Sequence, residues 1–161
     1  MSGTAVIGTG NTLRRDDGAG VEAARRIARA FPGAHVITGH GLQPEMAEAI
    51  SSCDVVVFLD ASVRTSAVSV TRVAPPDGPA GHNVHAVTPD GLMAIVEQLY
   101  GSAPREALLV EIPAFECGFG ERMSERTLRM VDSCVQLVAE LLRGETTPEI
   151  LLCLAPTPAH D

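Results

Sequence analysis

The sequence has no lysine and no tryptophan. Its 12 basic residues are all arginines, and they are outnumbered by 20 acidic residues, so the formal net charge is −8. The lack of lysine excludes Schiff-base chemistry and a P-loop lysine. The negative charge argues against binding to nucleic acid or to an anionic membrane. Aromatic residues make up only 3% of the chain, too few to predict a stacking surface for single-stranded nucleic acid.

Long apolar runs and closely spaced cysteines are also missing. No apolar stretch approaches the roughly 18–20 residues of a membrane span, and the N-terminus has no signal-peptide pattern. The four cysteines form no Cys-x-x-Cys pair of the kind that holds zinc or a redox dithiol. We therefore expect a cytoplasmic protein with free thiols. The length of 161 residues predicts a single domain over 1–161, with 145–161 as a loosely packed tail.

Short apolar runs alternate with helical patterns along the chain. The runs expected to form strands are 4–7, 34–38, 54–60 and 106–112, and the alternation at 68–73 is typical of an edge strand. Helical patterns cover 18–31, 44–52, 92–99 and 124–143. This order predicts the α/β class: a three-layer αβα sandwich with a mostly parallel, twisted sheet of about five strands and one antiparallel edge strand.

The loop after the first strand is rich in glycine and acid. It reads Gly8-Thr-Gly-Asn-Thr-Leu-Arg-Arg-Asp-Asp-Gly-Ala-Gly20. A dinucleotide fingerprint would need glycine where the chain has Leu13, and Asp16 and Asp17 would repel a pyrophosphate. A nucleotide-binding α/β enzyme is therefore only an alternative. One of the two aspartates is expected to cap the helix that follows.

Acidic residues follow two of the predicted strands. Asp16 and Asp17 come after the first strand, and Asp60 ends the most apolar one. Ligands bind at the carboxyl ends of the strands in an open α/β sheet, so these carboxylates should emerge on the same edge. Taken alone, Asp60 is as compatible with a turn cap as with a functional site.

A histidine is expected near the same edge. His85 lies just before a helix for which Thr88 is the predicted N-cap and Pro89 the first residue. Two carboxylates and an imidazole together would form a site for a divalent transition metal. A lone loop histidine usually has no such role, and His82 and His40 are alternatives.

Several of these segments resemble the hydrogenase maturation endopeptidases. They are the Gly-x-Gly-Asn-x-Leu-x-x-Asp-Asp-Gly-x-Gly-Val block at 8–21, the strand ending in Asp60, His85 before a Thr-Pro helix start, and the segment 115–124. Members of that family remove a short C-terminal extension from the large subunit of nickel–iron hydrogenases after nickel insertion. The resemblance implies an endopeptidase whose partner is a hydrogenase large-subunit precursor.

The resemblance also implies which residues bind the metal and catalyse the cleavage. The metal-contacting and catalytic residues of the family fall on Asp17, Asp60 and His85, with Asp16 as a further candidate for the general base. The metal implied is nickel carried by the substrate, although other divalent metals can occupy such a site. No His-Glu-x-x-His helix for a resident zinc occurs. The loop 38–42 departs from the family's acidic pattern, so the substrate need not be a typical hydrogenase.

Two other classes of function also fit the sequence. A non-catalytic nickel-checkpoint module for hydrogenase assembly would bind the precursor without shortening it. A nucleotide-dependent enzyme would use the loop at 8–10. A hydrolase of related architecture, such as peptidyl-tRNA hydrolase, is a more distant alternative, because an RNA substrate fits poorly with a charge of −8 and no lysine.

Overall fold

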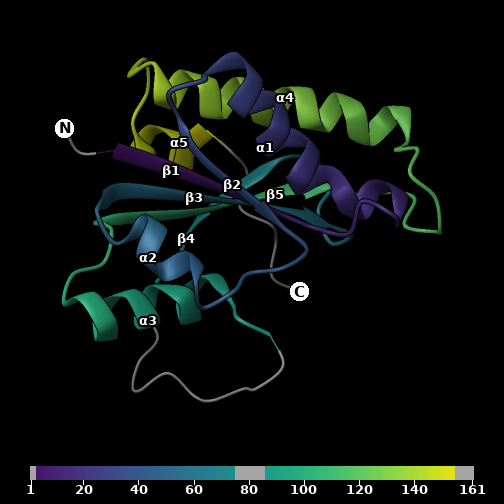
Figure 1. Cartoon of the computed structure of the whole chain (residues 1–161). Coiled ribbons are helices and arrows are strands. Elements are labelled where there is room, and N and C mark those ends of the chain that lie inside the picture. Colours follow the sequence, from purple (N-terminus) through teal and green to yellow (C-terminus); the bar gives the residue numbers. More distant parts are fainter. Residues whose placement is uncertain (1–2, 75–85, 155–161) are drawn as a thin grey trace.

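A five-stranded sheet forms the centre of the computed structural model, which describes residues 3–74 and 86–154 (Figure 1). Its strands are β1 (Gly3–Thr9), β2 (His35–Gly39), β3 (Cys53–Ser62), β4 (Ser69–Arg72) and β5 (Glu106–Pro113), in the spatial order β2-β1-β3-β5-β4. The first four in this order are parallel, and β4 pairs antiparallel with β5. The predicted sheet with one antiparallel edge strand is therefore confirmed.

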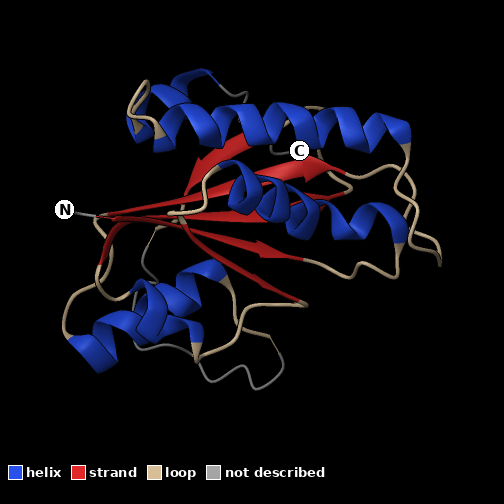
Figure 2. Cartoon of the chain, turned by 45° about the horizontal axis from the view of Figure 1, so that its top comes forward, coloured by secondary structure: helices blue, strands red, loops and turns tan. Residues whose placement is uncertain are grey.

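Helices cover both faces of this sheet (Figure 2). One face carries α1 (Ala19–Ala30), α4 (Glu125–Leu142) and the short α5 (Pro148–Leu154), and the other carries α2 (Met46–Ile50) and α3 (Pro89–Tyr100). Because both faces are covered, the middle of β3 is apolar throughout, and residues 56–59 are all buried. None of the helices in the described part of the chain combines the length and apolarity needed to cross a membrane.

Two helices begin where the sequence places their caps. The Thr88 hydroxyl accepts a hydrogen bond from the Gly91 amide at 3.2 Å, with Pro89 as the first residue of α3. The Ser124 hydroxyl accepts one from the Thr127 amide, also at 3.2 Å, at the start of α4. Such caps contribute about 1 kcal/mol each, which explains why they mark helix starts reliably.

The expected loose tail, 145–161, contains a packed helix in the part that the structure describes, 145–154. Pro148–Leu154 forms α5, which packs beside β4, and Leu151 is only 2% exposed. The helix has only seven residues, and its apolar residues follow one another without interruption from Ile150 to Leu154, so the sequence shows no helical periodicity there. Leu151 nevertheless completes the core that α1 and α4 form with the sheet.

Glycines let the first loop and α1 lie directly on the sheet. A side chain at Gly20 would collide with the backbone oxygens of Leu59 and Thr9, so α1 begins in close contact with the ends of β3 and β1. Gly10 has a φ of +147°, and a side chain there would meet the backbone oxygen of Asp17. The glycines that resemble a nucleotide fingerprint therefore pack this loop tightly against the strand ends.

Candidate functional site

The carboxyl ends of β1 and β3 are neighbours at one end of the sheet. From β1 the chain continues through α1, on one face, to β2. It then passes through α2, on the other face, to β3. The gap between β1 and β3 is thus a topological switch point, the usual ligand site of an open α/β sheet. The loops that surround it lie at the right-hand end of Figure 1, next to the start of α4.

The structure brings Asp17 and Asp60 together at this switch point. Asp17 lies in the 3₁₀ turn Arg15–Gly18, and its Oδ2 accepts a hydrogen bond from the Asn11 amide at 3.2 Å. Asp60 is near the end of β3 and is exposed. The two carboxylates are close enough for the charge of Asp17 to raise the pKa of Asp60. Their proximity agrees with the sequence prediction, and their roles in metal binding and catalysis stay predictions.

The pKa of Asp60 is raised to about 6. The main cause is desolvation by the surrounding protein, which acts even though the side chain reaches solvent, and the charges of Asp17 and Glu111 add to it. Hydrogen bonds from the Ala61 amide and the Thr9 side chain act in the opposite direction. A carboxyl group that titrates near neutral pH is suited to accept and release a proton during a reaction.

Asp16, unlike Asp17, has a structural role. Its side chain is fully buried. Its two carboxylate oxygens accept hydrogen bonds of 2.7–2.9 Å from the amides of Phe115, Glu116 and Ser124 and from the hydroxyls of Ser124 and Thr127. These bonds fasten the first loop to the segment between β5 and α4.

The surroundings of Asp16 bear on two expectations from the sequence, that it is a general base and that it or Asp17 caps α1. Burial alone would raise its pKa, but the hydrogen bonds from Ser124, Thr127 and Glu116 outweigh burial and lower the pKa to about 2. A buried carboxylate with this pKa and these partners is a poor general base. The expectation that Asp16 or Asp17 caps α1 is wrong, because the N-cap is Gly18 and no side chain caps this helix.

The third expected ligand, His85, lies outside the described residues, as does the alternative His82. The chain re-enters the described structure at residue 86, and Val87 pairs with Leu42, three residues after the end of β2. His40 is exposed directly after β2. Among residues 3–74 and 86–154, no group of three His, Cys, Asp or Glu side chains is placed to hold a metal ion. A metal ion held by Asp17 and Asp60 would need a third protein ligand from outside these residues.

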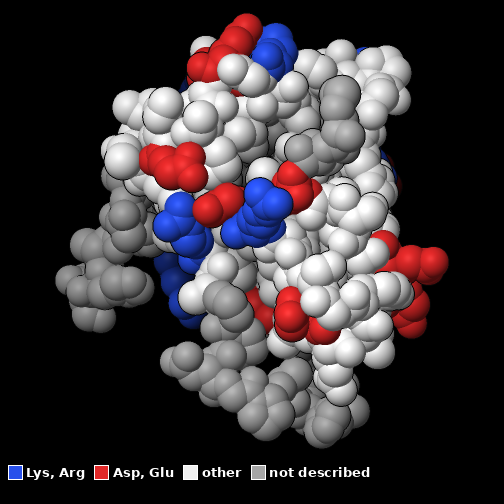
Figure 3. Space-filling model, turned by 90° about the vertical axis from the view of Figure 1, so that its left-hand side faces the viewer, with Lys and Arg blue, Asp and Glu red and all other residues white. Residues whose placement is uncertain are grey.

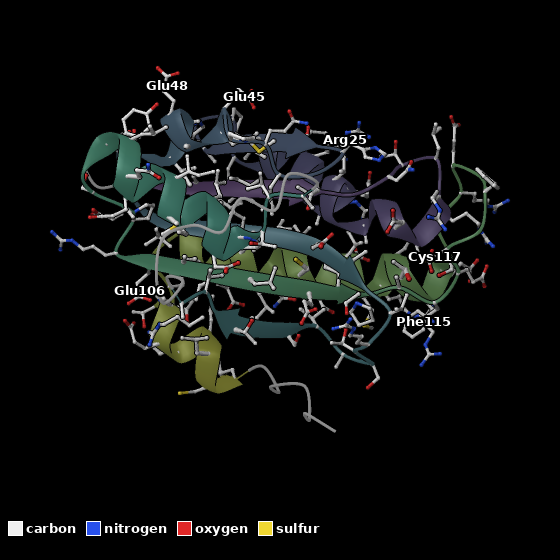
Figure 4. All side chains as sticks on the ribbon, turned by 90° about the horizontal axis from the view of Figure 1, so that it is seen from below. Arg25, Glu45, Glu48, Glu106, Phe115 and Cys117 are labelled. Carbon is white, nitrogen blue, oxygen red and sulfur yellow. The ribbon has the colours of Figure 1, made fainter. Side chains whose placement is uncertain are left out.

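Sequence reasoning misses three residues that border the two aspartates. Thr9 bonds to Asp60 and has no distinctive sequence pattern. Glu111 is opposite Asp60 in the register of β3 and β5, and it could have been noticed as the acid within the apolar run of β5. Burial raises the pKa of the Cys117 thiol, and the charge of nearby Asp17 raises it further. Figure 4 shows Cys117 at the end of the molecule opposite Glu106.

The fold and the switch point define an open α/β protein with an acidic site at the carboxyl end of its sheet. Solved structures identify the particular fold as that of the [NiFe] hydrogenase maturation proteases. HybD from Thermococcus kodakarensis matches with a TM-score of 0.67 at 20% identity, over 87% of this chain and 99% of that chain. HycI from Thermococcus kodakarensis KOD1 matches with a TM-score of 0.66 at 24% identity, over 88% of this chain and 93% of that chain.

A bacterial structure supports the same conclusion. The hydrogenase maturating endopeptidase HybD from E. coli matches with a TM-score of 0.60 at 18% identity, over 89% of this chain and 93% of that chain. No protein-family model and no curated protein sequence matches the chain. At these identities the likeness establishes the fold, and it confirms the fold that the sequence resemblance implies.

Proposed function

We propose that this chain is an endopeptidase that removes the C-terminal extension of a nickel–iron hydrogenase large-subunit precursor. The observation that carries the proposal is the juxtaposition of Asp17 and Asp60 at the switch point of a fold shared with hydrogenase maturation proteases. The four cysteines are free, which suits a reducing, cytoplasmic setting.

The proposed site recognises nickel as part of the substrate. Asp17, Asp60 and His85 are the proposed ligands, and two carboxylates with one imidazole suit a divalent transition metal that is shared with another protein. With only three protein ligands, such a site would leave coordination positions for ligands that the precursor supplies. When bound, the ion would supply Lewis acidity to the scissile carbonyl or to the attacking water. The protein residues would hold the cleavage site beside them.

Hydrolysis also requires a group that transfers a proton from the attacking water to the leaving amine. Water adds across the peptide bond, the C–N bond breaks, and the proton lost by the water goes to the leaving amine. Asp16 is unsuited to carry this proton because its pKa is about 2 and its oxygens are already bonded. Of the two candidates for this role, Asp17 and Asp16, we therefore assign the transfer to the carboxylate of Asp17.

The test incubates the purified protein with nickel-loaded and nickel-free large-subunit precursor and measures the mass of the precursor. The proposal expects shortening of the nickel-loaded form only. Asp17→Asn, Asp60→Asn and His85→Ala should each abolish shortening. Asp54→Asn is the matched control, because Asp54 lies near the amino end of β3, away from the switch point.

Other outcomes would contradict parts of this proposal. Equal cleavage of both precursor forms would exclude nickel recognition. Binding of the precursor without any change in mass would indicate a checkpoint module instead of a peptidase. A thermal shift caused by NAD or ATP would favour the nucleotide-binding alternative.

A further inference from the structure

An open pocket of about 410 Å³ has four arginines among its eight lining residues. We call it the arginine pocket, and its charged lining residues are Arg15, Arg122, Arg126, Arg129, Glu116 and Glu125. It lies between the first loop and the start of α4, and Arg15 is only two residues before Asp17. The loop that carries Asp17 therefore also contributes to this pocket.

Two of the four arginines are held by other groups of the protein, and two are not. Arg15 forms an ion pair with Glu116 at 2.5 Å and donates to the backbone oxygen of Arg122 at 3.0 Å. The Arg126 guanidinium stacks on the Phe115 ring, 3.8 Å from its centroid. Both side chains are thereby held in place. Arg122 and Arg129 are exposed and pair with no acidic side chain in the described part of the chain.

Exposed apolar side chains lie in the loops that border this pocket. Phe119, in the loop between Glu116 and Arg122, is 94% exposed, and Leu13 is 59% exposed. The two loops are joined because the Gly120 amide donates to the Leu13 oxygen at 2.9 Å. Phenylalanine and arginine are both enriched in protein–protein interfaces relative to the rest of the surface.

The charge of this pocket contrasts with the rest of the chain. The protein has a net charge of −8 and 12 arginines, and four of these arginines surround one pocket. At the opposite end of the sheet, basic side chains lie next to acidic ones (Figure 3). The pocket also contains acidic residues, but its four arginines outnumber its two glutamates. A long polyanion would meet repulsion outside the pocket. A short acidic segment of a protein would not.

We propose that the arginine pocket binds an acidic segment of the protein substrate. Arg122 and Arg129 pair with its carboxylates, since a guanidinium can donate two parallel hydrogen bonds to a carboxylate. Phe119 contacts apolar residues of the same segment. This inference rests on the proposed function and adds a recognition site, separate from Asp17 and Asp60, that positions the precursor for cleavage.

The first test measures peptide binding directly by fluorescence anisotropy at physiological salt. The probes are a labelled peptide that alternates glutamate with leucine and the same peptide with glutamine in place of glutamate. We expect the wild-type protein to bind the glutamate peptide at least tenfold more tightly, and the double variant Arg122→Gln/Arg129→Gln to lose that preference. Arg105→Gln is the matched control, because Arg105 is exposed next to the amino end of β5.

Peptide results of three kinds would overturn the inference. These are equal binding of both peptides, equal loss of binding in the Arg105→Gln control, and displacement of the peptide by micromolar inorganic phosphate. The last result would assign the pocket to phosphate instead of carboxylates. Circular dichroism of the variants, whose changed side chains are exposed, verifies that they remain folded.

The second test separates this inference from the proposed function. With nickel-loaded precursor, the double variant should raise KM about tenfold and leave kcat within twofold of wild type. Unchanged KM together with equal peptide binding overturns the inference while the endopeptidase proposal stands. If the wild-type protein leaves the precursor intact but binds the acidic peptide through Arg122 and Arg129, the endopeptidase proposal fails and the acidic-segment site stands.

Discussion

The carboxylate of Asp16 accepts a hydrogen bond from the hydroxyl of Thr127 at 2.8 Å, although the two residues are 111 positions apart in the chain. The same carboxylate also receives hydrogen bonds from the segment that precedes α4. Since Asp17 is the next residue, this buried anchor fixes the backbone from which one of the proposed site carboxylates extends. The arginine pocket depends on the same anchor, because Ser124 is both a lining residue and a partner of Asp16.

Asp16→Asn should lower the free energy of unfolding by about 3 kcal/mol. The asparagine amide group places a donor where the protein already presents amide and hydroxyl donors, so buried groups lose their partners. Asp17→Asn is the control, and it should change stability by less than about 1 kcal/mol because Asp17 is less buried and accepts a single weak hydrogen bond. Urea unfolding at pH 7 measures both. Equal stabilities of the two variants would contradict the anchoring role.

The contribution of Asp16 should depend on pH in a defined direction. Its folded pKa of about 2 is below the ordinary value of 3.8, so ionisation of Asp16 favours the folded state. This stabilisation is fully present above about pH 4 and is lost as the pH falls toward 2, with a magnitude of about 2 kcal/mol. Urea unfolding of wild type and Asp16→Asn between pH 7 and pH 2 should show their difference shrinking only below about pH 4. A constant difference down to pH 2 would contradict the prediction.

Asp60→Asn should have the opposite effect on stability. The folded pKa of about 6 is above the ordinary 3.8, so ionisation of Asp60 opposes folding. That penalty is absent below about pH 4, grows between pH 4 and 6 and is complete above pH 6. The variant should therefore be more stable than wild type at pH 8, by about 1 kcal/mol once solvent screening of this exposed carboxyl is included.

The measurement for Asp60 compares thermal or urea unfolding at pH 8 and pH 4. Asp54→Asn, on the same strand, is the control and should show no gain at pH 8. A stabilised variant that no longer shortens the precursor would mean that this carboxylate is kept for activity at the expense of stability. Loss of stability at pH 8 would show that Asp60 is a structural residue.

Local patterns were sufficient to predict the layers of the fold but not the contacts across loops. The apolar run of β3 and the caps at Thr88 and Ser124 each depend on residues within a few positions, so they can be read from the sequence. The role of Asp16 depends on partners 99–111 residues away, and local sequence therefore suggested a helix cap. The arginine pocket likewise joins residues from two distant segments. Asp17 and Asp60 were predictable together because the carboxyl ends of parallel strands share one edge.

Gly20→Ala should destabilise the protein by about 3 kcal/mol. The added methyl group would collide with the backbone oxygens of Leu59 and Thr9, which cannot move without shifting the ends of both strands. Gly33→Ala is the control, because nothing lies within 4 Å of its added carbon. Urea unfolding measures the loss, and the precursor assay should show reduced processing because α1 and the first loop move together. Equal stability of both variants would show that α1 does not need this close approach.

Leu151→Ala should lower the free energy of unfolding by about 2–4 kcal/mol. Leu151 is 2% exposed and belongs to the core beneath α1 and α4, although it comes from the short helix α5. Its neighbour Ile150 is 47% exposed, so Ile150→Ala removes a similar volume from the same helix with little loss of buried contact. That control should cost less than about 1 kcal/mol. If urea unfolding gives the same small loss for both variants, α5 does not contribute to the core and the tail is loosely packed after all.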